Sequence, residues 1–167
     1  MDTAYQPAAW HDLYLMVGGA AAGLTGLIFV AVSLHLEAVL RNPWHRGAAG
    51  SSLLALMSVV LISGTLLVPS APTGLVGAII ALIALASPAY SAVAIVHPPA
   101  GNRRALVTIW VGMGAGLLAV TAGVSLAIGV GGGLWLLLPA AAIALGSSVF
   151  NAWRLMVDVA SESTQAR

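Results

Sequence analysis

Long apolar stretches dominate the chain, and short segments rich in charge, proline or glycine separate them. With histidine counted as neutral, residues 13–36 and residues 47–102 contain no charged side chain. An α-helix needs roughly 20 apolar residues to cross about 30 Å of hydrocarbon, so the second stretch is long enough for two crossings. The pattern predicts an all-α, polytopic membrane helical bundle of five transmembrane helices in one domain, at about residues 12–40, 51–68, 73–96, 105–130 and 134–156.

The segments between the predicted spans carry residues that end or reverse a membrane helix. Residues 41–46 combine charge with a proline, and residues 69–72 contain two prolines. Residues 131–133 are a glycine triplet, which permits a tight reversal because glycine readily adopts positive φ. Inside the third span, Pro88 predicts a kink, because proline lacks the N–H group that a helix needs.

Composition excludes several classes of protein. With 60% hydrophobic and 7% charged residues, the chain has too little polar surface for a soluble domain, so we expect the lipid bilayer as its surroundings. No cysteine is present, which excludes disulfides and thiolate metal sites. A net charge of +1 gives no reason to expect a nucleic-acid partner. The first ten residues lack the basic start of a cleavable signal peptide, so we expect the first span to be permanent.

The arginines predict the orientation in the membrane. Short loops rich in arginine or lysine stay in the cytoplasm, and the chain has no lysine. Five crossings bring all the arginines to one side, namely Arg41, Arg46, Arg103, Arg104, Arg154 and Arg167. We therefore expect the N-terminus outside and the C-terminus in the cytoplasm.

A resemblance supports the same class of protein. The segment Trp10-His11-Asp12-Leu13-Tyr14 and the glycine-rich residues 17–34 that follow it resemble a family of small uncharacterised bacterial integral membrane proteins. The resemblance implies a multi-pass protein of the bacterial inner membrane, and it implies no activity.

Small residues recur at three- or four-residue spacing in two of the predicted spans. Membrane helices associate where small residues let their backbones approach closely. The candidate helix-packing glycines are Gly19, Gly23 and Gly26 in the first span, and Gly112, Gly116 and Gly123 in the fourth. They predict either packing within one chain or contacts in a homo-oligomer.

Hydroxyl and amide side chains form a second pattern within the spans. Ser51, Ser58 and Thr65 recur every seven residues and therefore share one face of the second span. Further polar positions in the later spans are Ser87, Ser91, Thr121, Ser125, Ser147 and Asn151. Such residues either bond to carbonyl groups of their own helix or line a wetted pore or groove.

The candidate metal ligands are His35, Glu37 and His97, which we expect at the cytoplasmic ends of spans one and three. Two imidazoles and a carboxylate suit a divalent ion, whereas histidine at a membrane interface also serves as an anchor. Beyond this possible divalent metal we expect no cofactor.

No catalytic motif accompanies these features, so we do not expect an enzyme. Two hypotheses for function follow. The first is a homo-oligomeric channel or transport-type protein for ions or small solutes, and the second is a non-catalytic accessory or regulatory partner of another membrane protein.

Overall fold

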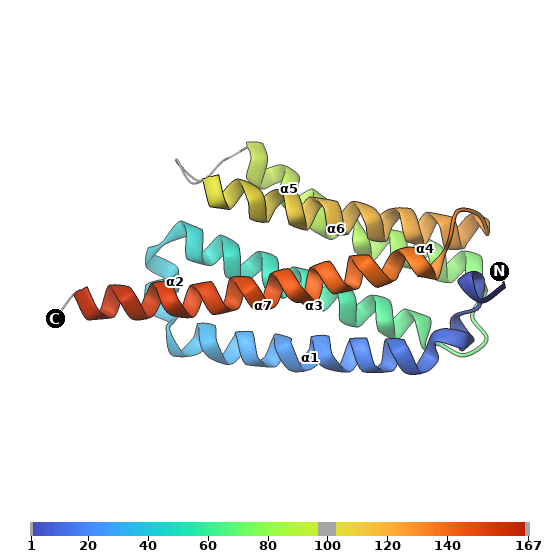
Figure 1. Cartoon of the computed structure of the whole chain (residues 1–167), viewed down its shortest axis with the longest axis horizontal. Helices are drawn as coiled ribbons and strands as arrows, with labels where there is room; N and C mark the ends of the chain where they lie inside the picture. Colours follow the sequence, from blue (N-terminus) through green and yellow to red (C-terminus); the bar gives the residue numbers. More distant parts are fainter. Residues whose placement is uncertain (1, 97–102, 166–167) are drawn as a thin grey trace.

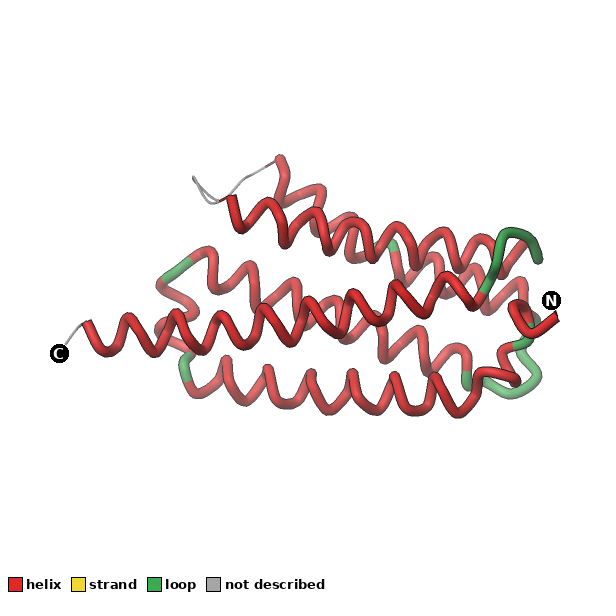
Figure 2. Tube along the Cα trace, in the orientation of Figure 1, coloured by secondary structure: helices red, strands yellow, loops and turns green. Residues whose placement is uncertain are grey.

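The structure is a computed structural model that describes residues 2–96 and 103–165. These residues form helices and connecting turns without any strand (Figure 2). Two short 3₁₀-helices, η1 (Asp2–Tyr5) and η2 (Pro7–Trp10), precede the long helices. The α-helices are α1 (His11–Leu34), α2 (Leu36–Arg41), α3 (Pro43–Leu66), α4 (Thr73–Ala84), α5 (Ala86–Val96), α6 (Arg103–Ile128) and α7 (Leu134–Gln165).

Five segments of the described chain are long and apolar enough to cross a membrane, which confirms the predicted polytopic helical bundle. They are Pro7–Leu34, His45–Leu66, Thr73–Val93, Leu106–Ile128 and Leu134–Arg154. Large apolar side chains such as Leu27, Phe29 and Leu82 point away from the bundle and are mostly exposed. An apolar exterior of this kind suits contact with lipid tails.

The helices lie roughly along one direction (Figure 1). Helix α1 packs mainly against α3, α4 packs against α6, and α7 contacts both α3 and α6. Figure 1 shows the two ends of the bundle: the N-terminus and the α6–α7 turn lie at one, and α2 and the C-terminus lie at the other. We call the first the N-terminal end and the second the arginine end.

The arginines within the described residues all lie toward the arginine end, as the sequence predicts. Arg41 ends α2, Arg46 lies in the first turns of α3, Arg103 begins α6, and Arg154 lies in the C-terminal part of α7. Which end faces the cytoplasm remains a prediction from the charge rule.

Residues 41–46 are more helical than expected. Helix α1 already ends at Leu34, where His35 breaks the helix with φ −119° and ψ 30°. Only the extended residue Asn42 separates α2 from α3, whose first residue is Pro43. Proline suits that position because the first N–H groups of a helix have no partner within the helix. At the other terminus α7 continues to Gln165, although a polar tail is expected after about residue 156.

The predicted proline break in the third span is present at Leu85, between α4 and α5. Pro88 cannot donate a hydrogen bond to the carbonyl group of Ala84, four residues earlier, so the regular ladder stops there. At the predicted glycine turn, Gly131, Gly132 and Gly133 all have positive φ, at 96°, 109° and 47°. Residues other than glycine rarely adopt positive φ. The tight α6–α7 reversal therefore depends on these glycines.

Candidate functional site

A cavity of about 290 Å³ lies toward the arginine end, between α3, α5, α6 and α7. We call it the wide cavity. Its polar lining consists of hydroxyl and amide side chains: Ser51, Ser52, Ser87, Tyr90, Ser91, Thr108, Ser147, Ser148 and Asn151. Among the lining residues that the structure describes, none carries a charge.

A second cavity, of about 60 Å³, lies deeper in the bundle and reaches α1. We call it the narrow cavity. Its polar lining is Tyr14, Ser58, Ser63, Ser87 and Ser147, and small apolar residues such as Ala115 and Ala140 complete its wall. Again, no charged side chain is among the lining residues within the described ranges.

The two cavities adjoin, because both are lined by Ala55, Ser87, Gly112 and Ser147. Along α3 the combined lining extends from Pro43 to Ser63. At 1.5 Å per residue this is about 30 Å, close to the thickness of the hydrocarbon layer. The lining residues of the two cavities together therefore follow α3 over most of the predicted membrane thickness.

Polar contacts between helices hold the walls of the wide cavity. Ser148 Oγ on α7 donates to the carbonyl oxygen of Ser52 on α3 at 3.4 Å, and Asn151 Nδ2 donates to Ser52 Oγ at 3.4 Å. Tyr90 Oη on α5 donates to the carbonyl oxygen of Gly47 at 3.3 Å. Ser87 Oγ donates to the carbonyl oxygen of Gly112 on α6 at 3.1 Å. Each such bond between membrane helices contributes roughly 0.6 kcal/mol, so the walls are held by several modest contacts.

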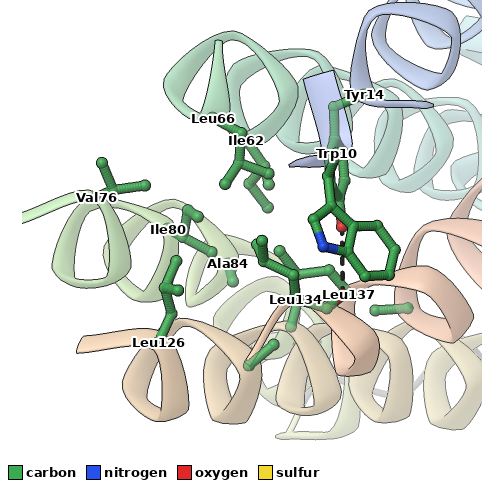
Figure 3. Packing of buried hydrophobic residues seen from close by; sticks show 13 residues of the cluster. Trp10, Tyr14, Ile62, Leu66, Val76, Ile80, Ala84, Leu126, Leu134 and Leu137 are labelled. Atoms are coloured by element: carbon green, nitrogen blue, oxygen red, sulfur yellow. Dashed lines mark hydrogen bonds between the residues drawn. The ribbon is translucent and has the colours of Figure 1, made fainter. Parts of the chain in front are cut away.

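The N-terminal end of this space is closed by large buried side chains, which we call the plug: Trp10, Tyr14, Ile62, Leu66, Leu134 and Leu137 (Figure 3). Tyr14, Ile62 and Leu137 line the narrow cavity, and the other members belong to the same buried cluster. Tyr14 Oη donates to the carbonyl oxygen of Leu134 at 3.4 Å. The Trp10 and Trp135 rings meet edge to face, with centroids 4.7 Å apart.

The N-terminal segment is also fixed to the α6–α7 turn. The N–H group of Gly132 donates to Tyr5 Oη at 2.9 Å, and a Cβ atom at Gly133 would overlap the carbonyl oxygen of Ala4. Trp10 Nε1 donates to the carbonyl oxygen of Thr3 at 2.7 Å. The plug therefore joins the N-terminal segment to the beginning of α7.

The structure brings together only part of the predicted hydroxyl pattern. The predicted polar residues that line the cavities are Ser51, Ser58, Ser87, Ser91, Ser147 and Asn151. Ser51 and Ser58 also bond to carbonyl groups of their own helix, at 3.0 Å to Ala48 and 2.9 Å to Leu54. A serine can therefore bond to a carbonyl group of its own helix and still line a cavity.

The other three predicted lining residues lie elsewhere. Thr65 and Thr121 are not among the cavity residues, and their hydroxyl groups donate to the carbonyl oxygens of Leu61 and Leu118, both at 2.8 Å. Ser125 lies in the last turn of α6, and its hydroxyl group donates to the carbonyl oxygen of Val130 and accepts from the N–H group of Gly133, both in the α6–α7 turn.

Several lining residues were not singled out from the sequence, namely Tyr14, Ser52, Ser63, Tyr90, Thr108 and Ser148. Ser52 follows Ser51 directly, and Ser148 lies one turn before Asn151. The position of Ser148 one helical turn from the predicted residue Asn151 is the signal that could have identified it from the sequence.

The predicted packing glycines divide into two groups. Gly112, Gly116 and Gly123 lie against α4 or α5: a Cβ atom at each would lie within 3.5 Å of Ser91, Pro88 or Ala81, respectively. Gly19, Gly23 and Gly26 are exposed on α1, and a Cβ atom there would meet no atom within 4 Å. We call these three residues the glycine face.

The candidate metal ligands are not brought together within the described chain, where no three His, Asp or Glu side chains cluster. His35 is exposed, and Glu37 lies 3.7 Å from Arg41 in an exposed ion pair. His97 lies outside the described residues. A divalent metal stays a prediction of the sequence.

No protein-family model, curated protein or solved structure matches this chain. The fold defines the class, a membrane protein with five apolar helices, and the cavities are the basis for proposing its function.

Proposed function

We propose that the protein is a transport-type membrane protein that carries small uncharged polar solutes along a path inside one chain. The observation that supports this proposal is the adjoining pair of hydroxyl-lined cavities, whose lining follows α3 from Pro43 to Ser63. Protein interiors are normally packed as densely as organic crystals. A hydroxyl-lined space of about 290 Å³ between membrane helices therefore favours a solute or water as its occupant.

The lining favours uncharged solutes over ions. An ion that enters a membrane loses its hydration, and ion channels replace it with rings of carbonyl or charged groups. The described lining offers hydroxyl and amide dipoles without charge. Such groups replace the hydrogen bonds of a neutral solute at much lower cost than those of an ion.

Passage across the whole membrane requires the plug to move. Within the plug, the hydrogen bond between Tyr14 and the Leu134 carbonyl group is 3.4 Å, which is long and therefore weak. In this proposal the plug is the gate of the path, and the wide cavity admits solute from the arginine end.

A substitution at the junction of the cavities tests the path. Ala55 lines both cavities, so Ala55→Leu places a larger side chain where they meet. We expect this variant to abolish most of the urea and glycerol entry into proteoliposomes, measured by stopped-flow light scattering. Ala78→Leu is the matched control, because Ala78 is exposed on α4 and outside both cavities. Equal flux in the two variants, or no flux above protein-free vesicles with the unaltered protein, would refute the proposal.

The glycine face favours a second candidate function, association with another membrane helix. Gly19 and Gly23 form a Gly-x-x-x-Gly motif that lies open on α1. Such motifs let two helices approach closely in lipid. The partner in this proposal is a second copy of the chain, which gives a homo-oligomer, or another membrane protein that this chain regulates.

The mass of the particle in nanodiscs tests self-association. Gly23→Leu fills the glycine face and is expected to shift an oligomer toward monomer. Gly114→Leu is the matched control, because Gly114 is likewise exposed with no atom near its Cβ position, but on α6. A monomeric unaltered protein would exclude the homo-oligomer, and specific loss of a co-purifying membrane protein in Gly23→Leu would favour the accessory role.

A further inference from the structure

Residues 2–10 form a separate segment at the N-terminal end of the bundle, which we call the strap. It consists of η1 and η2, and Gln6 between them is extended, with φ −115° and ψ 90°. Among its side chains that the structure describes, only Ala4 and Trp10 are buried, and Thr3, Gln6, Ala8 and Ala9 are exposed. Segments with so few buried side chains open locally at a much lower free energy than the core of a fold.

The α6–α7 turn is shaped to receive the strap. A Cβ atom at Gly133 would overlap the carbonyl oxygen of Ala4 and lie 2.9 Å from the ring of Tyr5. The N–H group of Gly132 donates to Tyr5 Oη at 2.9 Å. Within the turn, the N–H group of Gly133 donates to Ser125 Oγ of α6 at 2.9 Å, so α6 supports the turn independently of the strap. The turn therefore forms a seat whose fit depends on the missing side chain of Gly133.

Trp10 connects the strap to the plug. Its ring centroid lies 4.7 Å from that of Trp135 and 6.3 Å from that of Tyr14 (Figure 3). Its Nε1 atom donates to the carbonyl oxygen of Thr3, so the polar atom of the indole is bonded within the strap. The backbone of Trp10 is not α-helical, with φ −111° and ψ 7°, and α1 begins at the next residue. A rotation at Trp10 therefore moves the strap and the indole ring together and leaves α1 in place.

We propose that the strap is the lid of the solute path. While it is seated on the α6–α7 turn it closes the N-terminal end, and it opens the path by leaving the turn and carrying Trp10 out of the plug. The other members of the plug lie on α1, α3 and α7, so their movement requires membrane spans to separate. This inference rests on the proposed transport path and names the part of the plug that moves.

A single cysteine measures whether the strap is seated, because the chain contains no cysteine of its own. Ala4 is 7% exposed, so Ala4→Cys is expected to react slowly with maleimide in nanodiscs, where both membrane faces are accessible. Adding Gly133→Ala displaces the strap, and labelling is then expected to approach the rate of Thr3→Cys, at an exposed position. Adding Tyr5→Phe removes the acceptor for Gly132 and is expected to raise the rate about fivefold, the size of one net hydrogen bond.

Urea entry into proteoliposomes, measured without the cysteine, tests whether the strap is the lid. We expect entry to rise several-fold in Gly133→Ala and also to rise in Tyr5→Phe, which leaves the backbone of the turn unaltered. Gly129→Ala is the matched control for backbone strain. Gly129 also has positive φ, at 72°, but no described atom lies within 4 Å of its Cβ position. This control is expected to change neither labelling nor entry.

The outcomes separate this inference from the proposed function. Faster labelling in Gly133→Ala with unchanged urea entry overturns the lid, and the path stands if Ala55→Leu still blocks entry. Unchanged labelling in both strap variants also overturns the lid, because the strap is then not held by this seat. Absence of urea entry in the unaltered protein and in both strap variants overturns the path and the lid together. A rise of labelling and entry in the strap variants, with neither in Gly129→Ala, supports the lid.

Discussion

A Cβ atom at Gly77 of α4 would lie 2.6 Å from the carbonyl oxygen of Gly123 of α6, and a Cβ atom at Gly123 would lie 2.8 Å from the carbonyl oxygen of Gly77. The two glycines thus face one another where the helix backbones cross. Backbone atoms cannot give way as flexible side chains do, so this crossing depends on the absence of side chains at both positions.

Alanine at Gly123 is therefore expected to destabilise the bundle by about 1–3 kcal/mol, the usual cost of overpacking a tight contact. Alanine at Gly114, where a Cβ atom meets nothing within 4 Å, is expected to be neutral or stabilising. Unfolding of the purified protein in detergent, followed by circular dichroism against increasing dodecyl sulfate, measures both. Equal stability of the two variants would contradict the close α4–α6 contact.

The sequence predicts how many helices cross the membrane more fully than it predicts which face of each helix is buried. Pro88 and the glycine triplet give correct breaks because their effect is local to the backbone. Gly23 and Gly123 have the same spacing signal, but only Gly123 contacts another helix. Lipid tails are as apolar as a protein core, so apolar patterning cannot distinguish a lipid-facing side from a buried one.

The lining of the cavities is likewise predicted only in part by the sequence. The seven-residue spacing places Ser51, Ser58 and Thr65 on one face, and only the first two line a cavity. The lining is completed by α5, α6 and α7, whose approach depends on tertiary packing rather than on local pattern. Ser63 is an unremarkable serine in the sequence. That its buried hydroxyl group has no hydrogen-bond partner among the described residues is visible only once α1 and α3 are in place.

Loosening the plug is expected to increase solute flux. Trp10→Ala removes a buried indole ring from the contact with Trp135, so urea entry into proteoliposomes is expected to rise several-fold if the plug limits passage. Trp110→Ala is the control, because Trp110 is 62% exposed on the outside of α6. Folded Trp10→Ala protein with unchanged or slower flux would show that the plug is not the barrier.

The orientation can be tested without background labelling, because the chain contains no cysteine. We expect a cysteine at Ser70, in the exposed turn at the N-terminal end, to react with a membrane-impermeant maleimide in intact cells. A cysteine at Glu37, exposed on α2 at the arginine end, is expected to react only after the membrane is opened. The reverse pattern would overturn the orientation predicted from the arginines.

In the proposed path, water enters the bundle from the arginine end and reaches the narrow cavity, and the accessibility of single cysteines along α3 measures whether it does. Thiols react with maleimide as thiolates, which form in water and not in lipid. Single cysteines at Ser51, Ala55 and Ser58, which line the cavities, are expected to react in inside-out vesicles. Cysteines at Met57 and Leu61, which are about half exposed on the outside of α3, are expected to remain unmodified in the lipid. Protection of Ala55 and Ser58 to the same degree as Met57 and Leu61 would contradict a water-filled path.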